Sequence, residues 1–150
     1  MLFRSLSQAP IQMHSLRSFW TLLLPWPTAA LALYAITSIA TLAIAVVIWK
    51  SSSPMTVKFS ALILAAILIN PHLFVYDLAA LIPALLLLLD WALSQEDSPL
   101  SPALKLLLYL SFILPLFGPI SRWTHLQLSV IAFAAILWTL RRVTTSDCAI

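Results

Sequence analysis

The chain has 150 residues, of which 62% are hydrophobic and only 9% are charged, and its mean hydropathy is +1.03. Soluble domains carry roughly a quarter charged residues, so this composition argues against a soluble domain and indicates a helical membrane protein. The apolar runs are long and continuous rather than alternating, which argues against a transmembrane barrel. The net charge is +3, but the basic residues stand singly or in pairs between apolar runs, which indicates membrane topology and no nucleic-acid partner.

The scarcity of two residue types limits the chemistry further. Cys148 is the single cysteine, so the chain forms no internal disulfide and has no metal-ligand spacing. Gly118 is the single glycine, which excludes glycine-rich phosphate loops and the Gly-x-x-x-Gly helix dimer face. We therefore expect no metal and no cofactor, and we expect close helix contacts to use alanine and serine.

A short amphipathic helix is predicted over residues 15–26. Large apolar residues recur at i, i+3, i+4, i+7 and i+8, which forms one stripe of a helix: Leu16, Phe19, Trp20, Leu23 and Leu24. Arg17, Ser18 and Thr21 are expected to face away from this stripe, and Ser15 is the expected N-cap. Such a short segment cannot span a bilayer, so we expect it to lie in the membrane interface; a loop with chance periodicity is the alternative.

Five apolar segments follow, and we expect an all-α polytopic membrane protein in which they form the transmembrane helices: 28–49, 55–69, 73–93, 103–120 and 124–140. The first segment covers about 33 Å at ~1.5 Å per residue, enough for the hydrocarbon core. The second is short, so Lys58 has to extend to the interface. Pro83 lies inside the third segment and is expected to kink it, and Pro115 lies inside the fourth. Residues 1–27 are expected to be extracytoplasmic, and residues 141–150 to form a cytoplasmic tail.

The basic residues predict an orientation, because successive helices alternate sides. One side receives five of them: Lys50, Lys58, Lys105, Arg141 and Arg142. The other side receives three: Arg4, Arg17 and Arg122. The side richer in Lys and Arg is expected to be cytoplasmic. The chain is thus predicted to be a multi-pass protein of the plasma (cytoplasmic) membrane, with residues 70–77 on the extracytoplasmic side.

A polar corner interrupts the apolar runs at residues 70–78, with the sequence Asn-Pro-His-Leu-Phe-Val-Tyr-Asp-Leu. Ionisable groups are costly in a membrane, so an aspartate there indicates a functional site. His72 and Tyr76 are four residues apart and are expected to share a helix face with Asp77 close by. A helix N-terminus favours anions, either Asp77 itself or the phosphate of a ligand. A histidine at this place can bind a phosphate, transfer a proton or neutralise a carboxylate.

Structural roles fit the same residues. Tyr76 suits an aromatic belt at the membrane surface, and His72 suits an interfacial side chain that extends to water. Asp77 can pair with Arg122 or Arg17, which are expected on the same side. Arg122 is also the outer cation best placed to meet a lipid phosphate, although the same position suits a membrane anchor.

The stretch from Asn70 to Leu85 resembles the Pro-His-x-x-x-Tyr-Asp-Leu signature of glycosyltransferase family 87, which comprises polytopic GT-C enzymes and includes polyprenol-phosphate-mannose-dependent mannosyltransferases. Residues 11–19 are similar to the extracytoplasmic loop before that family's last helices. The resemblance implies the C-terminal part of a GT-C enzyme that moves a hexose such as mannose from a polyprenyl-phosphate donor to an extracytoplasmic acceptor. It also implies that His72 contacts the donor phosphate or assists proton transfer, and that Tyr76 and Asp77 shape the site or orient the histidine.

The chain also departs from the family's pattern. Family members are much longer, and their expected general base is an acidic residue in the first extracytoplasmic loop. The outer segments 1–27 and 118–123 contain no acidic residue. The resemblance therefore implies a fragment, or a chain that works with a partner carrying the missing N-terminal half and is inactive alone. The alternative is a small non-enzymatic membrane protein, either an assembly factor or half of a carrier with a broken-helix ion site at Pro83, Pro115 and Asp77.

Overall fold

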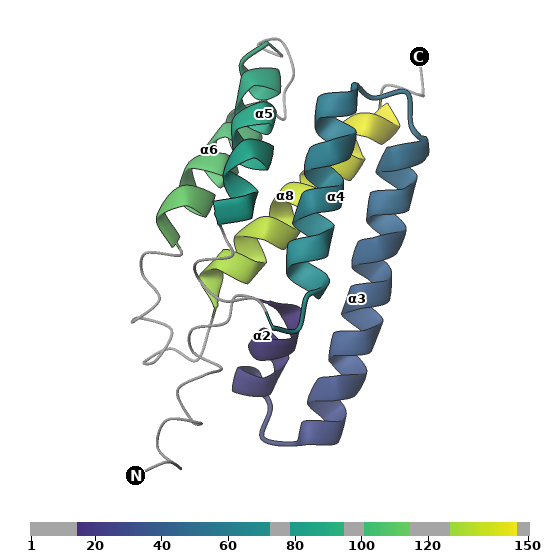
Figure 1. Cartoon of the computed structure of the whole chain (residues 1–150), viewed down its shortest axis with the longest axis vertical. Helices are drawn as coiled ribbons and strands as arrows, with labels where there is room; N and C mark the ends of the chain where they lie inside the picture. Colours follow the sequence, from purple (N-terminus) through teal and green to yellow (C-terminus); the bar gives the residue numbers. More distant parts are fainter. Residues whose placement is uncertain (1–14, 73–78, 95–100, 115–126, 147–150) are drawn as a thin grey trace.

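The computed structural model is a bundle of helices (Figure 1), and it describes residues 15–72, 79–94, 101–114 and 127–146. Six helices and no strand occur within these ranges: α2 (Leu16–Leu23), α3 (Pro27–Lys50), α4 (Met55–Ile69), α5 (Leu81–Ser94), α6 (Ser101–Ile113) and α8 (Leu128–Ser146). The prediction of an all-α chain is confirmed.

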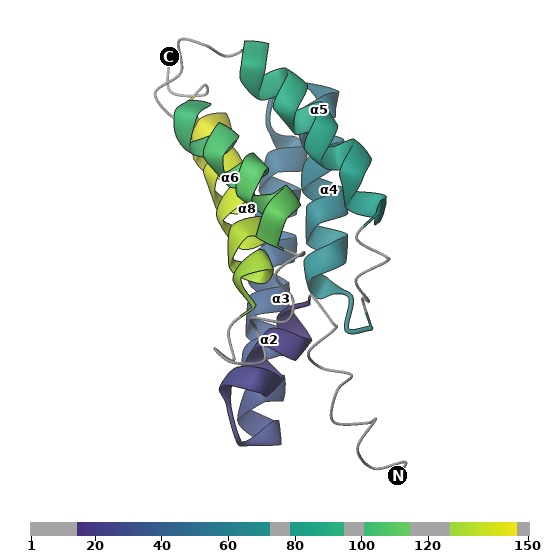
Figure 2. The same cartoon turned by 90° about the vertical axis from the view of Figure 1, so that its left-hand side faces the viewer.

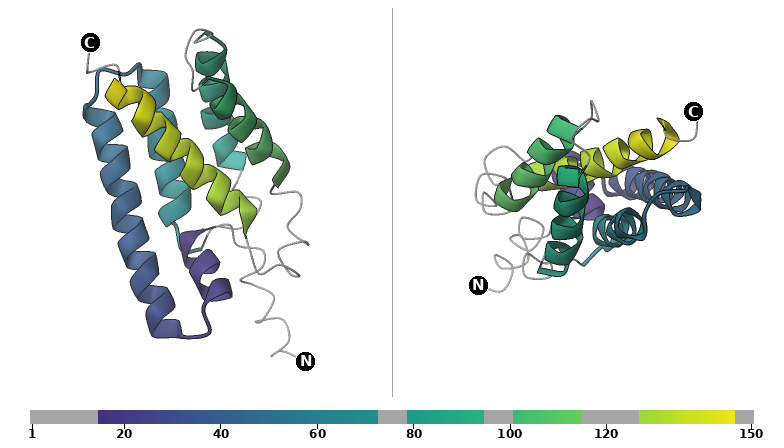
Figure 3. Two further views of the ribbon diagram at one scale, coloured as in Figure 1. Left: turned by 180° about the vertical axis from the view of Figure 1, so that it is seen from behind. Right: turned by 90° about the horizontal axis from the view of Figure 1, so that it is seen from above.

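The helices run alternately up and down, and α8 joins them into one core. Figure 3 shows α8 lying diagonally across α3 and α4, and Figure 2 shows α6 beside it. Phe133 and Ile136 of α8 are fully buried in the same apolar cluster as Leu64 and Leu68 of α4. The core is therefore shared by all the described helices, with α4 packed most extensively against α5 and α3, and α8 closing it on the other side.

Proline and asparagine set the ends of α3 and α4. Pro27 occupies the first turn of α3, where its fixed φ suits a helix and its missing N–H costs no hydrogen bond. Asn70 ends α4 in an extended conformation (φ −62°, ψ 117°), because the following Pro71 disfavours the helical region for the residue before it. The structure places α4 at the predicted range and α3 within one residue of its predicted ends.

Other helix ends differ from the prediction. The described α-helical part of α5 begins at Leu81, so Pro83 lies in the first turn of that part, where its missing N–H costs no hydrogen bond. The kink predicted at Pro83 stays a prediction. Helix α8 continues to Ser146, so its predicted end at residue 140 is wrong, while the cytoplasmic location of residues 141–150 stays a prediction. Helix α2 ends at Leu23 because Leu24, which precedes Pro25, adopts an extended conformation. Residues 73–78, 115–120 and 124–126 of the predicted segments lie outside the described residues.

Length and composition allow one of the described helices to cross a membrane. This helix is α3, with 24 residues. Three shorter apolar helices accompany it: Met55–Ile69, Leu81–Ser94 and Pro102–Ile113. One such helix gives weak support to membrane association and does not establish a multi-pass arrangement.

The alternation of the helices brings most of the described cations to one end of the bundle. Lys50 is the last residue of α3, while Lys58 and Lys105 lie near the starts of α4 and α6. Arg141 and Arg142 lie near the end of α8, and all four of these helix ends lie toward the upper part of Figure 1. The short helix α2, which carries an exposed Arg17, lies at the opposite end.

The burial of Phe133 gives a direct test of the packing of α8. Phe133 is 0% exposed, whereas Phe112 of α6 is 39% exposed. Phe133→Ala is expected to lower the free energy of unfolding by about 3–5 kcal/mol, because it removes buried contacts and leaves a cavity. Phe112→Ala is the matched control, with an expected change within about 1 kcal/mol. Thermal unfolding of the purified chain in detergent measures both changes, and equal shifts would contradict this core.

Candidate functional site

Of the four predicted site residues, the structure describes His72. Its side chain is exposed, and its backbone N–H donates a hydrogen bond to Asn70 Oδ1 at 3.1 Å. His72 therefore lies in a turn directly after α4, and its predicted place in the first turns of the next helix stays a prediction, because residues 73–78 lie outside the described residues. Tyr76, Asp77 and Arg122 lie outside the described residues, so their place beside His72 stays a prediction.

A tyrosine of α3 fixes the backbone just before this turn. The Tyr34 hydroxyl donates to the carbonyl oxygen of Ile69, the last residue of α4, at 2.7 Å. The last carbonyls of a helix have no intrahelical partner, so a side-chain donor stabilises this end. The sequence did not predict this contact, although the phenol of Tyr34, the one tyrosine of α3, could have indicated it. The turn with His72 thus begins at a fixed point of the bundle.

The amphipathic helix α2 is present. The sequence predicts that Ser18 faces away from its apolar stripe, and this prediction is wrong. Ser18 is only 2% exposed, while Arg17 and Thr21 are exposed as predicted. Ser18 forms a capping box with Ser15: the Ser15 N–H donates to Ser18 Oγ at 3.1 Å and the Ser18 N–H donates to Ser15 Oγ at 3.4 Å.

The Ser18 hydroxyl also connects α2 to the start of α8. Ser18 Oγ lies 2.8 Å from the Ser15 carbonyl oxygen and 2.9 Å from Gln127 Oε1, and both contacts suit a hydroxyl donor. Gln127 is buried and directly precedes α8. The polar contact joins residues 109 positions apart in the sequence. Burial without partners would be costly for these polar groups, so Ser18 is placed inside by its hydrogen bonds.

The apolar stripe of α2 packs on the bundle. Leu16 is buried, and Phe19 and Trp20 form an edge-to-face pair with ring centroids 5.2 Å apart. The Trp20 indole N–H donates to Thr37 Oγ1 of α3 at 3.1 Å. Helix α2 is therefore held against α3 by both apolar packing and a directed hydrogen bond.

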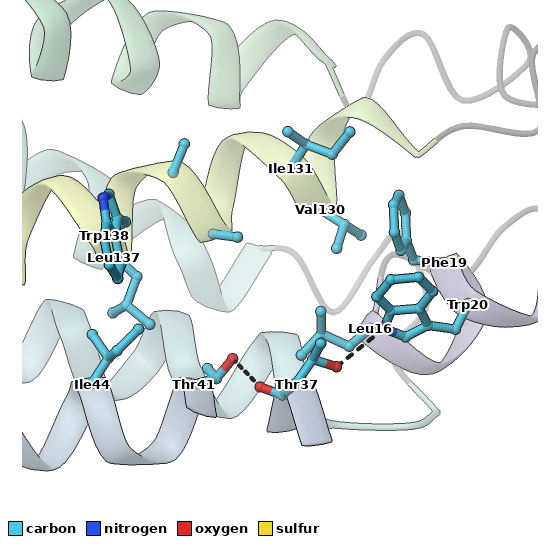
Figure 4. Close-up of a pocket in the computed structure, with 12 residues that line it drawn as sticks. Leu16, Phe19, Trp20, Thr37, Thr41, Ile44, Val130, Ile131, Leu137 and Trp138 are labelled. Carbon is cyan, nitrogen blue, oxygen red and sulfur yellow. Dashed lines mark hydrogen bonds between the residues drawn. The ribbon is translucent and has the colours of Figure 1, made fainter. Parts of the chain in front are cut away.

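An apolar groove of about 580 Å³ lies between α3 and α8 and is bounded at one end by α2 (Figure 4). This α3–α8 groove is lined by Leu16, Phe19, Trp20, Thr37, Thr41, Ile44, Val130, Ile131, Ala134, Ala135, Leu137 and Trp138. The two threonine hydroxyls donate within their own helix, Thr37 to the Leu33 carbonyl at 2.7 Å and Thr41 to the Thr37 carbonyl at 2.8 Å. The groove has the size of a ligand pocket and a hydrocarbon-like lining.

Two arginines lie beside Trp138, the lining residue of α8 farthest from α2. The Arg141 and Arg142 guanidinium carbons are 5.1 Å and 5.8 Å from the Trp138 ring centroid, within the range of cation–π contacts. One end of the groove is therefore formed by the Trp138 ring, and the positively charged guanidinium groups of Arg141 and Arg142 lie beside this ring.

No family model, curated protein or solved structure matches this chain. The relationship to glycosyltransferase family 87 that residues 70–85 suggest thus stays a prediction. Within the described ranges, no three His, Cys, Asp or Glu side chains are arranged to hold a metal ion.

The contact between Ser18 and Gln127 predicts how firmly α2 is attached. Ser18→Ala removes the hydroxyl and is expected to cost about 1–3 kcal/mol, with faster amide hydrogen exchange in α2. Thr21→Ala is the matched control, because Thr21 is exposed on the same helix. Hydrogen-exchange mass spectrometry compares the two variants. Unchanged exchange of α2 in Ser18→Ala, or equal acceleration in both variants, would contradict this role of Ser18.

Proposed function

We propose that this chain is a multi-pass membrane bundle in which α3, α4, α5, α6 and α8 cross the bilayer. The observation that carries this proposal is the apolar exterior. Each of the six described helices bears an exposed large hydrophobic side chain, and on α3 Ile36 and Ile39 are 62% and 69% exposed. Soluble monomers rarely expose apolar patches larger than a few hundred Å², whereas lipid tails are as apolar as leucine.

The short helices are compatible with this placement. Helices α4, α5 and α6 have 15, 14 and 13 described residues, which cover about 20–23 Å at ~1.5 Å per residue. A bilayer adapts to short spans by thinning, and long basic side chains extend to the interface. Lys58 and Lys105 are half-buried near helix starts, as such side chains would be.

The separation of charge supports an orientation. Lys50, Lys58, Lys105, Arg141 and Arg142 gather at one end of the bundle, which the proposal places on the cytoplasmic side. Helix α2 and the turn with His72 lie at the opposite end of the bundle, which the proposal places on the extracytoplasmic side. Helix α2 would lie in that interface with its apolar stripe against α3 and its Arg17 side exposed.

We further propose that the chain is the C-terminal part of a polyprenyl-phosphate-dependent hexosyltransferase and forms the donor side of its active site. Mannose is the expected sugar. The acceptor hydroxyl loses its proton to a base as its oxygen attacks the anomeric carbon. The bond between that carbon and the phosphate oxygen breaks, and polyprenyl phosphate leaves with the electron pair. His72 would contact the phosphate as its charge develops, with Asp77, Tyr76 and Arg122 beside it, and the base would come from the N-terminal half.

What supports this assignment is the motif at residues 70–78 together with the exposure of His72 at the end of the bundle opposite the cations. The carrier alternative has less support, because it requires helices that are interrupted within the membrane. Pro83 lies in the first turn of α5 and does not interrupt the described part of that helix.

The transferase proposal predicts a large effect at His72. Membranes from cells that express the chain at its native locus are supplied with radiolabelled polyprenyl-phosphate mannose, and the label in glycosylated product is measured. His72→Ala is expected to lower transfer about 10²-fold or more, as loss of proton transfer or phosphate contact does. Lys50→Ala, at the opposite end of the bundle, is expected to keep the parent rate.

Two outcomes would contradict the transferase proposal. Transfer at the parent rate in His72→Ala would remove His72 from the mechanism. Equal transfer by membranes from cells that lack the chain would remove the chain from the reaction altogether.

A further inference from the structure

The α3–α8 groove suits an apolar occupant. Its lining offers hydrocarbon surface, since the hydroxyls of Thr37 and Thr41 donate to carbonyls of α3 and the Trp20 indole N–H donates to Thr37. A polar ligand would lose its hydration in such a groove without gaining hydrogen bonds from these groups. Val130, Ile131 and the other lining residues of α8 provide dispersion contacts instead.

The charge at one end of the groove selects the kind of apolar molecule. Arg141 and Arg142 stand over Trp138, and none of the residues that line the groove is acidic. The arginine guanidinium is planar, and the fork formed by its N–H donors matches the geometry of phosphate oxygens. An amphiphile with an apolar chain and an anionic headgroup is therefore complementary to the groove and to its basic end.

The position of the groove matches a lipid of one leaflet. From Trp138 to Val130 the groove follows α8 for about 12 Å at ~1.5 Å per residue, away from the arginines and toward α2. In the proposed orientation the arginines lie on the cytoplasmic side, where anionic phospholipids concentrate and attract basic residues next to the membrane.

We infer that the α3–α8 groove binds one acyl chain of an anionic phospholipid, whose phosphate lies at Arg141 and Arg142. The inference rests on the proposed membrane placement and not on the transferase chemistry. The lipid is also distinct from a polyprenyl-phosphate donor, because the arginines and His72 lie at opposite ends of the bundle.

The first experiment tests the headgroup. The purified full chain in detergent is titrated with phosphatidylglycerol and with phosphatidylcholine, and bound lipid is counted by native mass spectrometry. Phosphatidylglycerol is expected to bind at least about tenfold more tightly, in keeping with attraction by two cations. The double variant Arg141→Gln/Arg142→Gln is expected to lose this preference. Lys50→Gln/Lys58→Gln, which removes the same charge from the same end, is expected to keep it.

The second experiment tests the groove itself. A phosphatidylglycerol with a photoactivatable acyl chain is crosslinked to the chain, and the crosslinks are expected on α3 and α8 along the groove. Ala134→Trp fills the groove from an exposed position and is expected to abolish these crosslinks. Ala35→Trp, an exposed position on the opposite face of α3, is expected to retain them.

Several results would overturn the inference. They are equal affinity for the two lipids, an undiminished preference in Arg141→Gln/Arg142→Gln, and crosslinks that spread evenly over the apolar exterior. A dimer that Ala134→Trp dissociates would assign the groove to a second copy of the chain. Any of these results would refute the lipid site. If the chain nevertheless requires detergent for extraction from cells, the proposed membrane placement would still hold.

Discussion

Apolar side chains cost free energy wherever they face water, and this chain has them both inside and outside its bundle. Phe133 and Leu64 fill the interior, while Ile36 and Ile39 are among the most exposed side chains of α3. A helix satisfies its own backbone hydrogen bonds, so it is a structure that tolerates apolar surroundings on every side. This constraint accounts for the all-helical fold and confines most charged groups to the ends of the helices.

The two ends of the bundle then differ in kind. One end has hydrogen bonds that shape the backbone: Ser18 with Gln127, Trp20 with Thr37, and Tyr34 with the last carbonyl of α4. The other end gathers positive charge from α3, α4, α6 and α8. The proposed sugar transfer belongs to the first end, and the proposed anionic phospholipid belongs to the second. In the proposed membrane placement, the first end would face one leaflet and the basic end would face the other.

Local signals in the sequence predicted the helices well where proline and asparagine mark their ends. Helix α4 lies at its predicted range because Pro54 precedes it and Asn70 with Pro71 follows it. Helix α8 extends past the predicted end because arginine is a good helix former, and Arg141 and Arg142, which the prediction took as the start of a tail, continue the helix.

Local signals in the sequence could not predict contacts between segments that are far apart along the chain. Ser18 is buried because Gln127, far along the chain, accepts from it, and a polarity pattern contains no information about that partner. The α3–α8 groove also needs the packing of three helices, although the spacing of Trp138, Arg141 and Arg142 on one helix could have indicated its basic end. Of the predicted site, the structure describes the turn at His72, and the motif that suggested it remains the basis of the transferase proposal.

The orientation of the bundle in a membrane is the central claim, and cysteine accessibility tests it most directly. Cys148→Ser removes the native thiol, and single cysteines then replace Thr28, Ser52 and His72, which are exposed at alternate ends of α3 and α4. With a membrane-impermeant maleimide on intact cells, Thr28→Cys and His72→Cys are expected to react, and Ser52→Cys only after the membrane is opened. Reaction of all three positions from the same side, or of Ser52→Cys alone from outside, would contradict the account.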